Sequence, residues 1–448
     1  MHVHNQSRYS FTKNRHSQSS LVDALSARHK AIKALQGRLE RQKFMGHEER
    51  PFGTEKDALF ATVIFFINFT IIDTGKDGWR AHMRAAGKLV EAYLSLSADS
   101  PSSEAPACVI QMSLNENGAD GSRSLSLKTE QISKPHKSQP RSSLPPVSQS
   151  SLFDCVAADF IAYYVWSGTL DTLTYSAQKK CYNIPSIDID LGNILPLLVR
   201  TEANSYHSCP AHLLLMILRT SILAREILSN GTDHPNRPTI EQLDSCEKLL
   251  MEMQSLDTQA WAVEICNRNV RILGSVDEDE VRIRTHIALT YQATAFLYML
   301  LVVPELQEHI WSKHSSIEGE MQDDVPPLLS AEDYASTALQ LLSSIPPASP
   351  LYKYTTWPVF MTGVGAVMPE RRAWVMARMQ TMLGLCQWGM LCSAMETLTE
   401  IWKLRDAEMV MGQSDSDMAI GEKSDAEQLR NDNWLVQLRN LSIDCLIV

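Results

Sequence analysis

Apolar side chains recur every three, four or seven residues along most of this 448-residue chain, and this periodicity constrains the fold more than any other feature. The first such stripe includes Leu21, Leu25 and Ile32, and the last includes Trp434 and Leu438. A stripe of this spacing lies on one face of an α-helix and is buried against neighbouring helices. Strand-like alternation is nearly absent, as is the strand–helix rhythm of α/β enzymes. The sequence therefore predicts an all-α fold, an irregular bundle of many helices.

Caps and breakers mark where the expected helices begin and end. Pro210 is expected at the first position of a helix, where its missing amide donor costs nothing. Thr239 followed by Gln242 matches a capping box, and Pro304 is expected to end a long apolar helix. Helices are expected over about 21–50, 54–72, 79–96, 153–168, 194–201, 210–229, 239–256, 281–303, 331–342, 369–385, 390–405 and around 434–441.

One long segment interrupts the helical pattern. Residues 97–151 are rich in Ser, Pro, Gly and Gln and hold few large apolar side chains. Such a composition buries too little apolar area to offset the entropy of ordering, so we expect a long disordered, flexible insertion. The expected organisation is a disordered N-terminus over 1–20, a first helical part over 21–96, the insertion, and the remaining helical domain over 152–448, with a polar acidic loop near 412–425.

Charge and cysteine usage exclude several classes of protein. The formal net charge is −11, which argues against broad binding of nucleic acid by the chain's own surface. The nine cysteines stand singly and are odd in number, which favours a reduced compartment over a disulfide framework. The polar N-terminus does not read as a secretory signal. The most hydrophobic stretch, 58–72, is short for a bilayer and contains Asn68, so we expect a buried core helix.

No familiar catalytic signature is present: the chain has no P-loop, no G-x-S-x-G and no H-E-x-x-H. Gly363 and Gly365 form a Gly-x-Gly that follows no convincing strand, so a turn is favoured over a phosphate loop. His207, Cys209 and His212 resemble part of a zinc site but have no fourth ligand nearby in sequence, and incidental side chains at a helix start are favoured. His309 and His314 are five residues apart and do not stack as metal ligands, and Cys386 and Cys392 are expected to pack in the core. We expect no catalytic residues, no metal ion and no cofactor.

Two charged segments have alternative interpretations. The basic face of the first helix (Arg28, Lys30, Lys33, Arg38, Arg41 and Lys43) suits a solvated surface better than DNA contact, because no recognition framework accompanies it. The acidic loop near Asp415 and Glu427 resembles an activation segment but has few apolar anchors, so a solvated loop is favoured.

Four segments in order resemble the fungal-specific transcription factor domain that follows a zinc cluster in many fungal regulators. They are LSARHKAIKAL at 25–35, the apolar helix and W-x-x-H element of 57–90, the Cys209-Pro210 helix start, and WPVFMTGVGAVMPERRAWVMARM at 357–379 followed by METLTEIWKLRD at 395–406. The W-P-x-F-x-x-G segment and the closing W-x-x-R-D are the most telling. The match spans about 21–445.

The motif residues are expected to be structural. Trp357 and Trp402 are expected to fill the core while the indole N–H finds a partner, and Gly363 permits a turn or a close backbone approach. Arg405 and Asp406 are expected to cap or pair at a helix end. His82, in the W-x-x-H element, is expected to make a helix contact rather than to catalyse.

The resemblance implies a non-enzymatic, nuclear regulator of transcription, often of metabolism or biosynthetic gene clusters, acting through protein contacts or effector sensing. Its expected partners are other transcriptional proteins or a second copy of the chain, with DNA reached only indirectly or through a zinc cluster missing from this sequence. That cluster needs six cysteines beginning C-x-x-C, and none precedes Cys108. The alternatives are a helical scaffold or cofactor protein derived from such a regulator, and an enzyme with an unrecognised helical site.

Overall fold

The computed structural model describes residues 54–73, 208–229, 237–273, 277–315 and 329–415, together with isolated residues between 26 and 33, 82 and 88, and 195 and 202. Within these ranges the fold is entirely helical and contains no strand, which confirms the predicted all-α class. The helices are α2 (Thr54–Asp73), α6 (Ala211–Ser229), α7 (Ile240–Gln254), α8 (Thr258–Leu273), α9 (Glu278–Val302), α10 (Glu305–Ser315), α11 (Ala331–Ser343), the 3-10 helix η1 (Tyr352–Thr355), α12 (Thr356–Gly365), α13 (Pro369–Cys386) and α14 (Gly389–Asp415).

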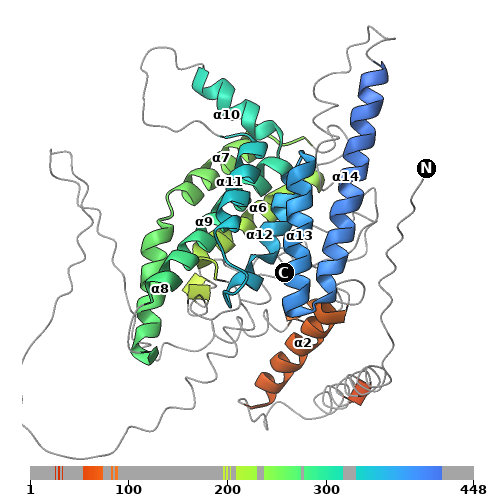
Figure 1. Ribbon diagram of the computed structural model, residues 1–448. Coiled ribbons are helices and arrows are strands. Elements are labelled where there is room, and N and C mark those ends of the chain that lie inside the picture. The colour runs from red at the N-terminus through yellow and green to blue at the C-terminus, as the bar shows by residue number, and fades with distance from the viewer. Residues whose placement is uncertain are drawn as a thin grey trace, which may run out of the picture.

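The long helix α9 forms the centre of the bundle and contacts α6, α7, α8, α10, α11 and α12 (Figure 1). The Asp277 side chain accepts a hydrogen bond from the Asp279 amide at its start, and three acidic residues in the first turn complement the helix dipole. The helix ends just before Pro304, as predicted. By length and composition α9 is apolar enough to cross a bilayer, but 72% of that apolar window is buried inside the bundle, as in the core helix of a globular domain.

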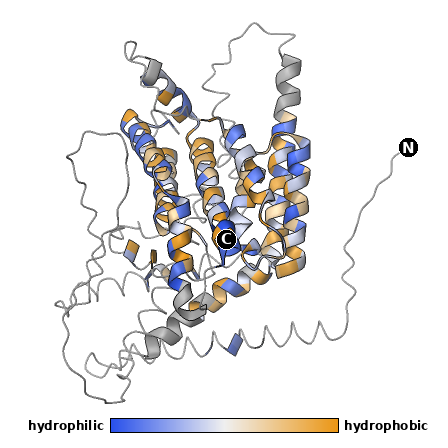
Figure 2. Cartoon of the chain, turned by 60° about the vertical axis from the view of Figure 1, so that its left-hand side comes forward, coloured by the Kyte–Doolittle hydropathy of each residue, from blue (hydrophilic) through white to orange (hydrophobic). Residues whose placement is uncertain are grey.

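Helix α12 lies between α9, α11, α13 and α14, and every one of its residues is buried. Trp357, near its start, stacks on Tyr291 of α9 with ring centroids 5.8 Å apart and meets Tyr298 edge-on at 6.3 Å. A helix that is hydrophobic on all sides suits only the interior of a protein. Figure 2 shows that helices at the outside of the bundle carry hydrophilic as well as hydrophobic residues.

The turn predicted at Gly363 and Gly365 is wrong, because both glycines belong to α12. Two glycines in three residues disfavour a helix by propensity, and tertiary packing overrides that preference here. The absence of a side chain at each glycine lets neighbouring helices approach closely: an added Cβ at Gly363 would lie 2.8 Å from Leu398 Cδ1, and one at Gly365 would lie 3.0 Å from Leu297 Cδ1.

Several other helix boundaries agree with the predictions. The Thr239 hydroxyl accepts from the Gln242 amide while the Gln242 side chain accepts from the Thr239 amide, which confirms the capping box. Pro369 occupies the first turn of α13. The helix start predicted at Pro210 is one residue too early: α6 begins at Ala211, and Pro210 precedes the helix with its carbonyl accepting from the Leu214 amide.

Other elements differ from the predictions. Helices α8 and α10 were not predicted at all, and α14 continues to Asp415 instead of ending at Arg405, so it includes 412–415, the first residues assigned to the acidic loop. The rest of that loop, the segments 1–20 and 97–151, and the helices expected over 153–168 and around Trp434 lie outside the described residues.

Helix α2 is the buried helix that the apolar stretch 58–72 predicts. Val63, Phe66 and Ile67 belong to the core, while Phe65 and Ile72 are exposed. The helix lies against one end of α14 (Figure 1), where a Cβ added to Gly389 would lie 1.8 Å from the Asp73 carbonyl oxygen. Only glycine at the start of α14 permits this approach of the two backbones.

Candidate functional site

The residues of the W-x-x-R-D motif meet the end of α12. The Trp402 indole Nε1 donates to the Gly363 carbonyl at 2.9 Å, and Arg405 Nη1 donates to the Val364 carbonyl. From α13, Arg372 Nε donates to the Ala366 carbonyl at 3.2 Å. The last carbonyls of a helix lack the regular intrahelical donors. The Ala366 amide donates to the Gly363 carbonyl at 3.2 Å, and these three side chains supply further donors to the C-terminus of α12. The predictions for Trp402 and Arg405 are confirmed, although Arg405 caps α12 rather than its own helix.

Asp406 completes this junction. Its two carboxylate oxygens accept from Arg372 Nη1 at 2.8 and 2.9 Å, and the same guanidinium lies 5.5 Å from the centre of the Trp402 ring. Arg372 therefore joins α12, α13 and α14 through a carbonyl, a carboxylate and an aromatic face. The motif residues are used to hold helices together.

Glu202 and Arg378 are among the ionisable side chains buried elsewhere in the bundle. Glu202 accepts from the Ala211 amide at 2.6 Å and lies 3.8 Å from Arg268; burial raises the pKa of its carboxyl, while the amide and Arg268 oppose that rise. Arg378 lies over the rings of Tyr352 and Trp374 at 4.2 and 5.4 Å, and desolvation lowers its pKa to about 10. Its Nε atom has no hydrogen-bond partner.

The proposed metal ligands near the start of α6 are not brought together among the described residues. His207 lies outside those residues, Cys209 is buried, and His212 is exposed on the second residue of the helix. Burial and the nearby Glu202 raise the pKa of the Cys209 thiol well above its ordinary value, which disfavours the thiolate that a metal needs.

The remaining cysteine and histidine candidates also have defined surroundings. Cys386 is half-buried but Cys392 is exposed, so the prediction of a core position for Cys392 is wrong; it lies one turn into α14, on the outer side of the bundle. His82 stacks on Phe66 with ring centroids 5.1 Å apart, a helix contact as expected. His314 lies in α10, and its side chain is outside the described residues.

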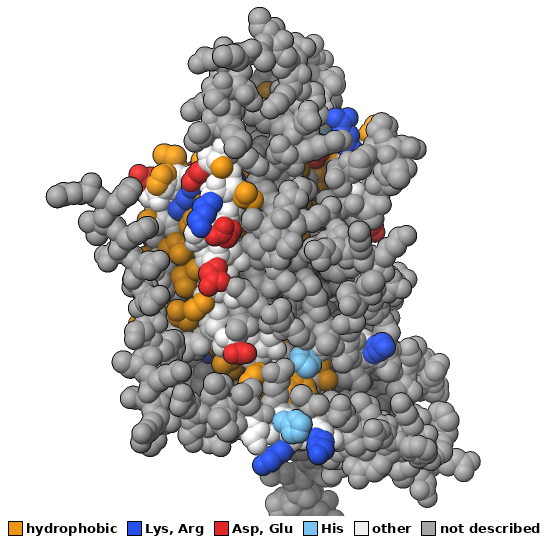
Figure 3. Space-filling model, turned by 90° about the vertical axis from the view of Figure 1, so that its right-hand side faces the viewer, with side chains coloured by type: hydrophobic (Ala, Val, Ile, Leu, Met, Phe, Trp, Pro, Cys, Tyr) orange, Lys and Arg blue, Asp and Glu red, His pale blue; other side chains and the backbone are white. Residues whose placement is uncertain are grey.

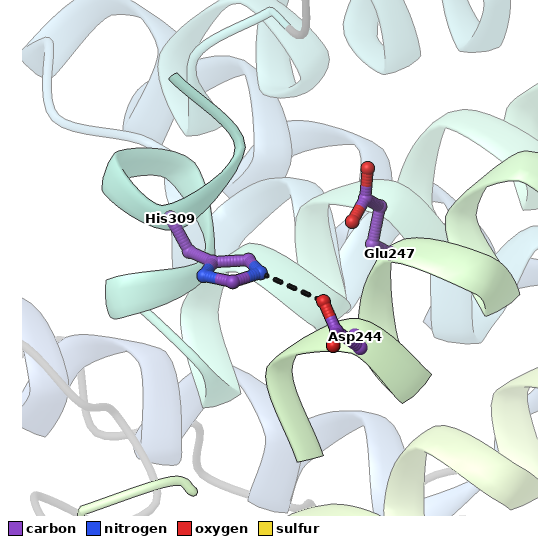
Figure 4. Close-up of side chains that lie close together, drawn as sticks. All are labelled: Asp244, Glu247 and His309. Atoms are coloured by element: carbon purple, nitrogen blue, oxygen red, sulfur yellow. Dashed lines mark hydrogen bonds and ion pairs between the residues drawn. The ribbon is translucent and has the colours of Figure 1, made fainter. Parts of the chain in front are cut away.

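A polar cluster that sequence reasoning missed joins α7 to α10. The α7–α10 cluster consists of Asp244, Glu247, His309 and Lys313. His309 Nε2 lies 3.1 Å from Asp244 Oδ1, and Figure 4 shows the imidazole and both carboxyl groups converging. Lys313 Nζ donates to Asp244 at 3.2 Å and to Glu247 at 2.7 Å. These hydrogen bonds lower the pKa of Asp244, Lys313 first and His309 second. The signal was invisible in sequence because the partners are more than sixty residues apart.

The basic face expected on the first helix is described at two positions, Lys30 and Lys33, and both are exposed. The other four residues of that face lie outside the described part of the chain. On the face shown in Figure 3, acidic, basic and hydrophobic side chains of the described residues are interspersed, and the basic ones do not gather into one patch.

The fold and its junctions define a class: an all-helical domain whose motif residues serve architecture. Comparison with known proteins gives the family. The chain belongs to the fungal specific transcription factor domain family, which it matches over residues 1–445. It is also similar to the acriflavine sensitivity control protein acr-2 of Neurospora crassa, with 26% identity over 437 residues, or 96% of this chain.

The chain spans 56% of the length of that relative. No solved structure matches it. The resemblance stated from the W-P-x-F-x-x-G and W-x-x-R-D segments is therefore confirmed, and membership places the chain among transcription regulators in general.

Proposed function

We propose that this chain is the regulatory domain of a nuclear, non-enzymatic transcription regulator that acts through contacts with other transcriptional proteins or with a second copy of itself. The family match over residues 1–445 carries the proposal. The junction of Trp402, Arg405 and Asp406 supports it, because these motif residues hold α12 in place and leave recognition to the outer surfaces.

In this proposal DNA is reached either indirectly, through a partner protein, or through a zinc cluster outside this sequence. A zinc cluster of the kind that precedes this domain in many regulators requires six cysteines beginning C-x-x-C, and the nine cysteines of this sequence include no such pair. The residues present do not fit that metal centre. A partner protein, or a segment outside this sequence, therefore supplies the contact with DNA.

The genes under control belong to metabolism or to a biosynthetic cluster in our proposal, and an effector bound by the helical domain sets the response. The name of the Neurospora relative concerns sensitivity to acriflavine. Tolerance of that drug is therefore a second output to measure beside metabolic transcripts.

The test is deletion of the gene in its host and complementation with a fluorescently tagged full chain. We expect nuclear fluorescence, a set of transcripts that changes on deletion and returns on complementation, and association of the tagged chain with the promoters of that set. A chain that stays in the cytoplasm and alters no transcript would refute the proposal.

A helical scaffold or cofactor derived from such a regulator is the second candidate, favoured by motif residues that hold helices together. Chromatin immunoprecipitation in strains lacking individual DNA-binding regulators distinguishes the two. Promoter association that depends on one of those regulators indicates a cofactor, whereas transcript changes without any promoter association indicate a scaffold.

A further inference from the structure

The α7–α10 cluster has the composition of a metal site. Asp244 and Glu247 lie three residues apart on α7 and therefore share a face of that helix, and His309 reaches them from α10. One ligand atom from each of the three lies within 4.8 Å of the other two (Figure 4). An imidazole nitrogen with two carboxylate oxygens is a ligand set that suits zinc and its neighbours in the first transition row.

A cation already occupies this place, which is an independent sign that positive charge is stabilised there. The Lys313 ammonium lies 2.7 Å from Glu247 Oε2 and 3.2 Å from Asp244 Oδ1. Glu247 and His309 are mostly buried, with side chains 16% and 17% exposed, whereas the Asp244 and Lys313 side chains are 51% and 48% exposed. The lysine can therefore turn into water while Glu247 and His309 keep their positions, and Asp244 closes the site from the solvent side.

The cluster carries enough negative charge to balance a divalent cation. Two carboxylates face one ammonium, so Lys313 compensates only one of their two negative charges. A divalent cation in place of the ammonium would neutralise both carboxylates and use the imidazole as a third ligand, with water completing the coordination. Calcium and magnesium prefer sets made of oxygen alone, so the histidine favours zinc, cobalt or nickel.

We propose that Asp244, Glu247 and His309 bind one divalent transition-metal ion in competition with the Lys313 ammonium, and that this ion clamps α10 onto α7. The apolar contacts of Leu306 and Ile310 hold α10 against the core without the metal. The ion would add a second attachment on the polar side of the same helix. This inference does not depend on the proposed function.

Titration of the purified full chain with Co²⁺ tests the site. Calorimetry gives the stoichiometry of binding, and the visible absorption of the bound Co²⁺ distinguishes nitrogen and oxygen ligands from thiolates. The chain has 13 histidines and nine cysteines, so differences between variants carry the result. His309→Ala and Glu247→Gln remove ligands. Lys313→Met removes the competitor, and His286→Ala is the matched control, because His286 is also half-buried but contacts the Ser344 hydroxyl.

We expect the wild-type chain to bind one more equivalent of Co²⁺ than either ligand variant, His286→Ala to behave as wild type, and Lys313→Met to bind that equivalent at least tenfold more tightly. Equal stoichiometry and affinity in wild type, His309→Ala and Glu247→Gln would overturn the proposal. Binding by Lys313→Met no tighter than wild type would also overturn it. Glu247→Gln preserves the shape of the side chain, so this variant alone tests the site if His309→Ala fails to fold.

Discussion

Replacing Gly363 with alanine adds one methyl group at the most crowded point of α12. The new Cβ would lie 2.8 Å from Leu398 Cδ1 and 2.9 Å from Val375 Cγ1. Both neighbours are fully buried, and valine in a helix has one strongly preferred rotamer, so neither side chain has a free direction in which to move. Overpacking of this kind costs about 1–3 kcal/mol.

Alanine also has the better helix propensity, which opposes that cost by about 1 kcal/mol. We therefore expect Gly363→Ala to lower the free energy of unfolding by up to about 2 kcal/mol, the difference between the two effects. Gly384→Ala is the matched control: Gly384 lies in α13 with nothing within 4 Å of its added Cβ. Only the propensity gain applies there, so this variant is expected to be more stable by about 0.5–1 kcal/mol.

Urea unfolding of both variants and of the wild-type chain, followed by far-UV circular dichroism, measures these changes. A shift in the urea concentration at the midpoint reports a change in stability when the dependence of the unfolding free energy on urea is the same in all three proteins. The two substitutions should shift the midpoint in opposite directions. A Gly363→Ala protein that is stabilised as much as Gly384→Ala would refute the packing argument, because it would show that the space around α12 accepts a methyl group without strain.

Three further predictions use the same unfolding assay. Trp402→Phe removes the indole donor to the Gly363 carbonyl, which keeps the Ala366 amide as its other donor, and should destabilise the protein by about 0.5–1.5 kcal/mol; an unchanged midpoint would show that the indole bond contributes nothing. Arg378→Met replaces a desolvated guanidinium whose neighbours are aromatic rings, and it should be neutral or stabilising by about 1 kcal/mol; a loss of several kcal/mol would show that the charge is compensated. Burial raises the pKa of Glu202 in the folded chain above its value in the unfolded chain, so its contribution to stability is fully present below pH 4.5 and is lost as pH rises through the raised value. Glu202→Gln should therefore gain stability relative to wild type as pH rises from 4 to 8; a difference independent of pH would contradict this.

Local chemistry made part of the fold predictable. The capping box at Thr239 and the stop before Pro304 depend on residues adjacent in sequence, and both are present. Helix α12 was missed because its amphipathic period is absent: all of its residues are buried, and its glycines argue against a helix. Propensity cannot report that Leu398, far along the chain, needs the space at Gly363.

The candidate sites, like the helices, were predictable where they depend on residue type and not where they depend on tertiary packing. Motif residues such as Trp402 and Arg405 were recognised as structural from their residue types, but their acceptors on α12 depend on how three helices pack. In the sequence, the histidine nearest to His309 is His314, and their spacing predicts no shared site. The contact of His309 is Asp244 on α7, which is separated from α10 by two other helices, and only the tertiary fold brings them together.

The burial of α12 on every side has a consequence for how the domain opens. A helix with one face in water exchanges its amide hydrogens through local fraying, but α12 has no such face, and its last carbonyls are held by side chains from two other helices. Its amides therefore exchange with solvent only when the surrounding helices separate. The slowest deuterium uptake in α12 would thus report the global unfolding free energy of the bundle.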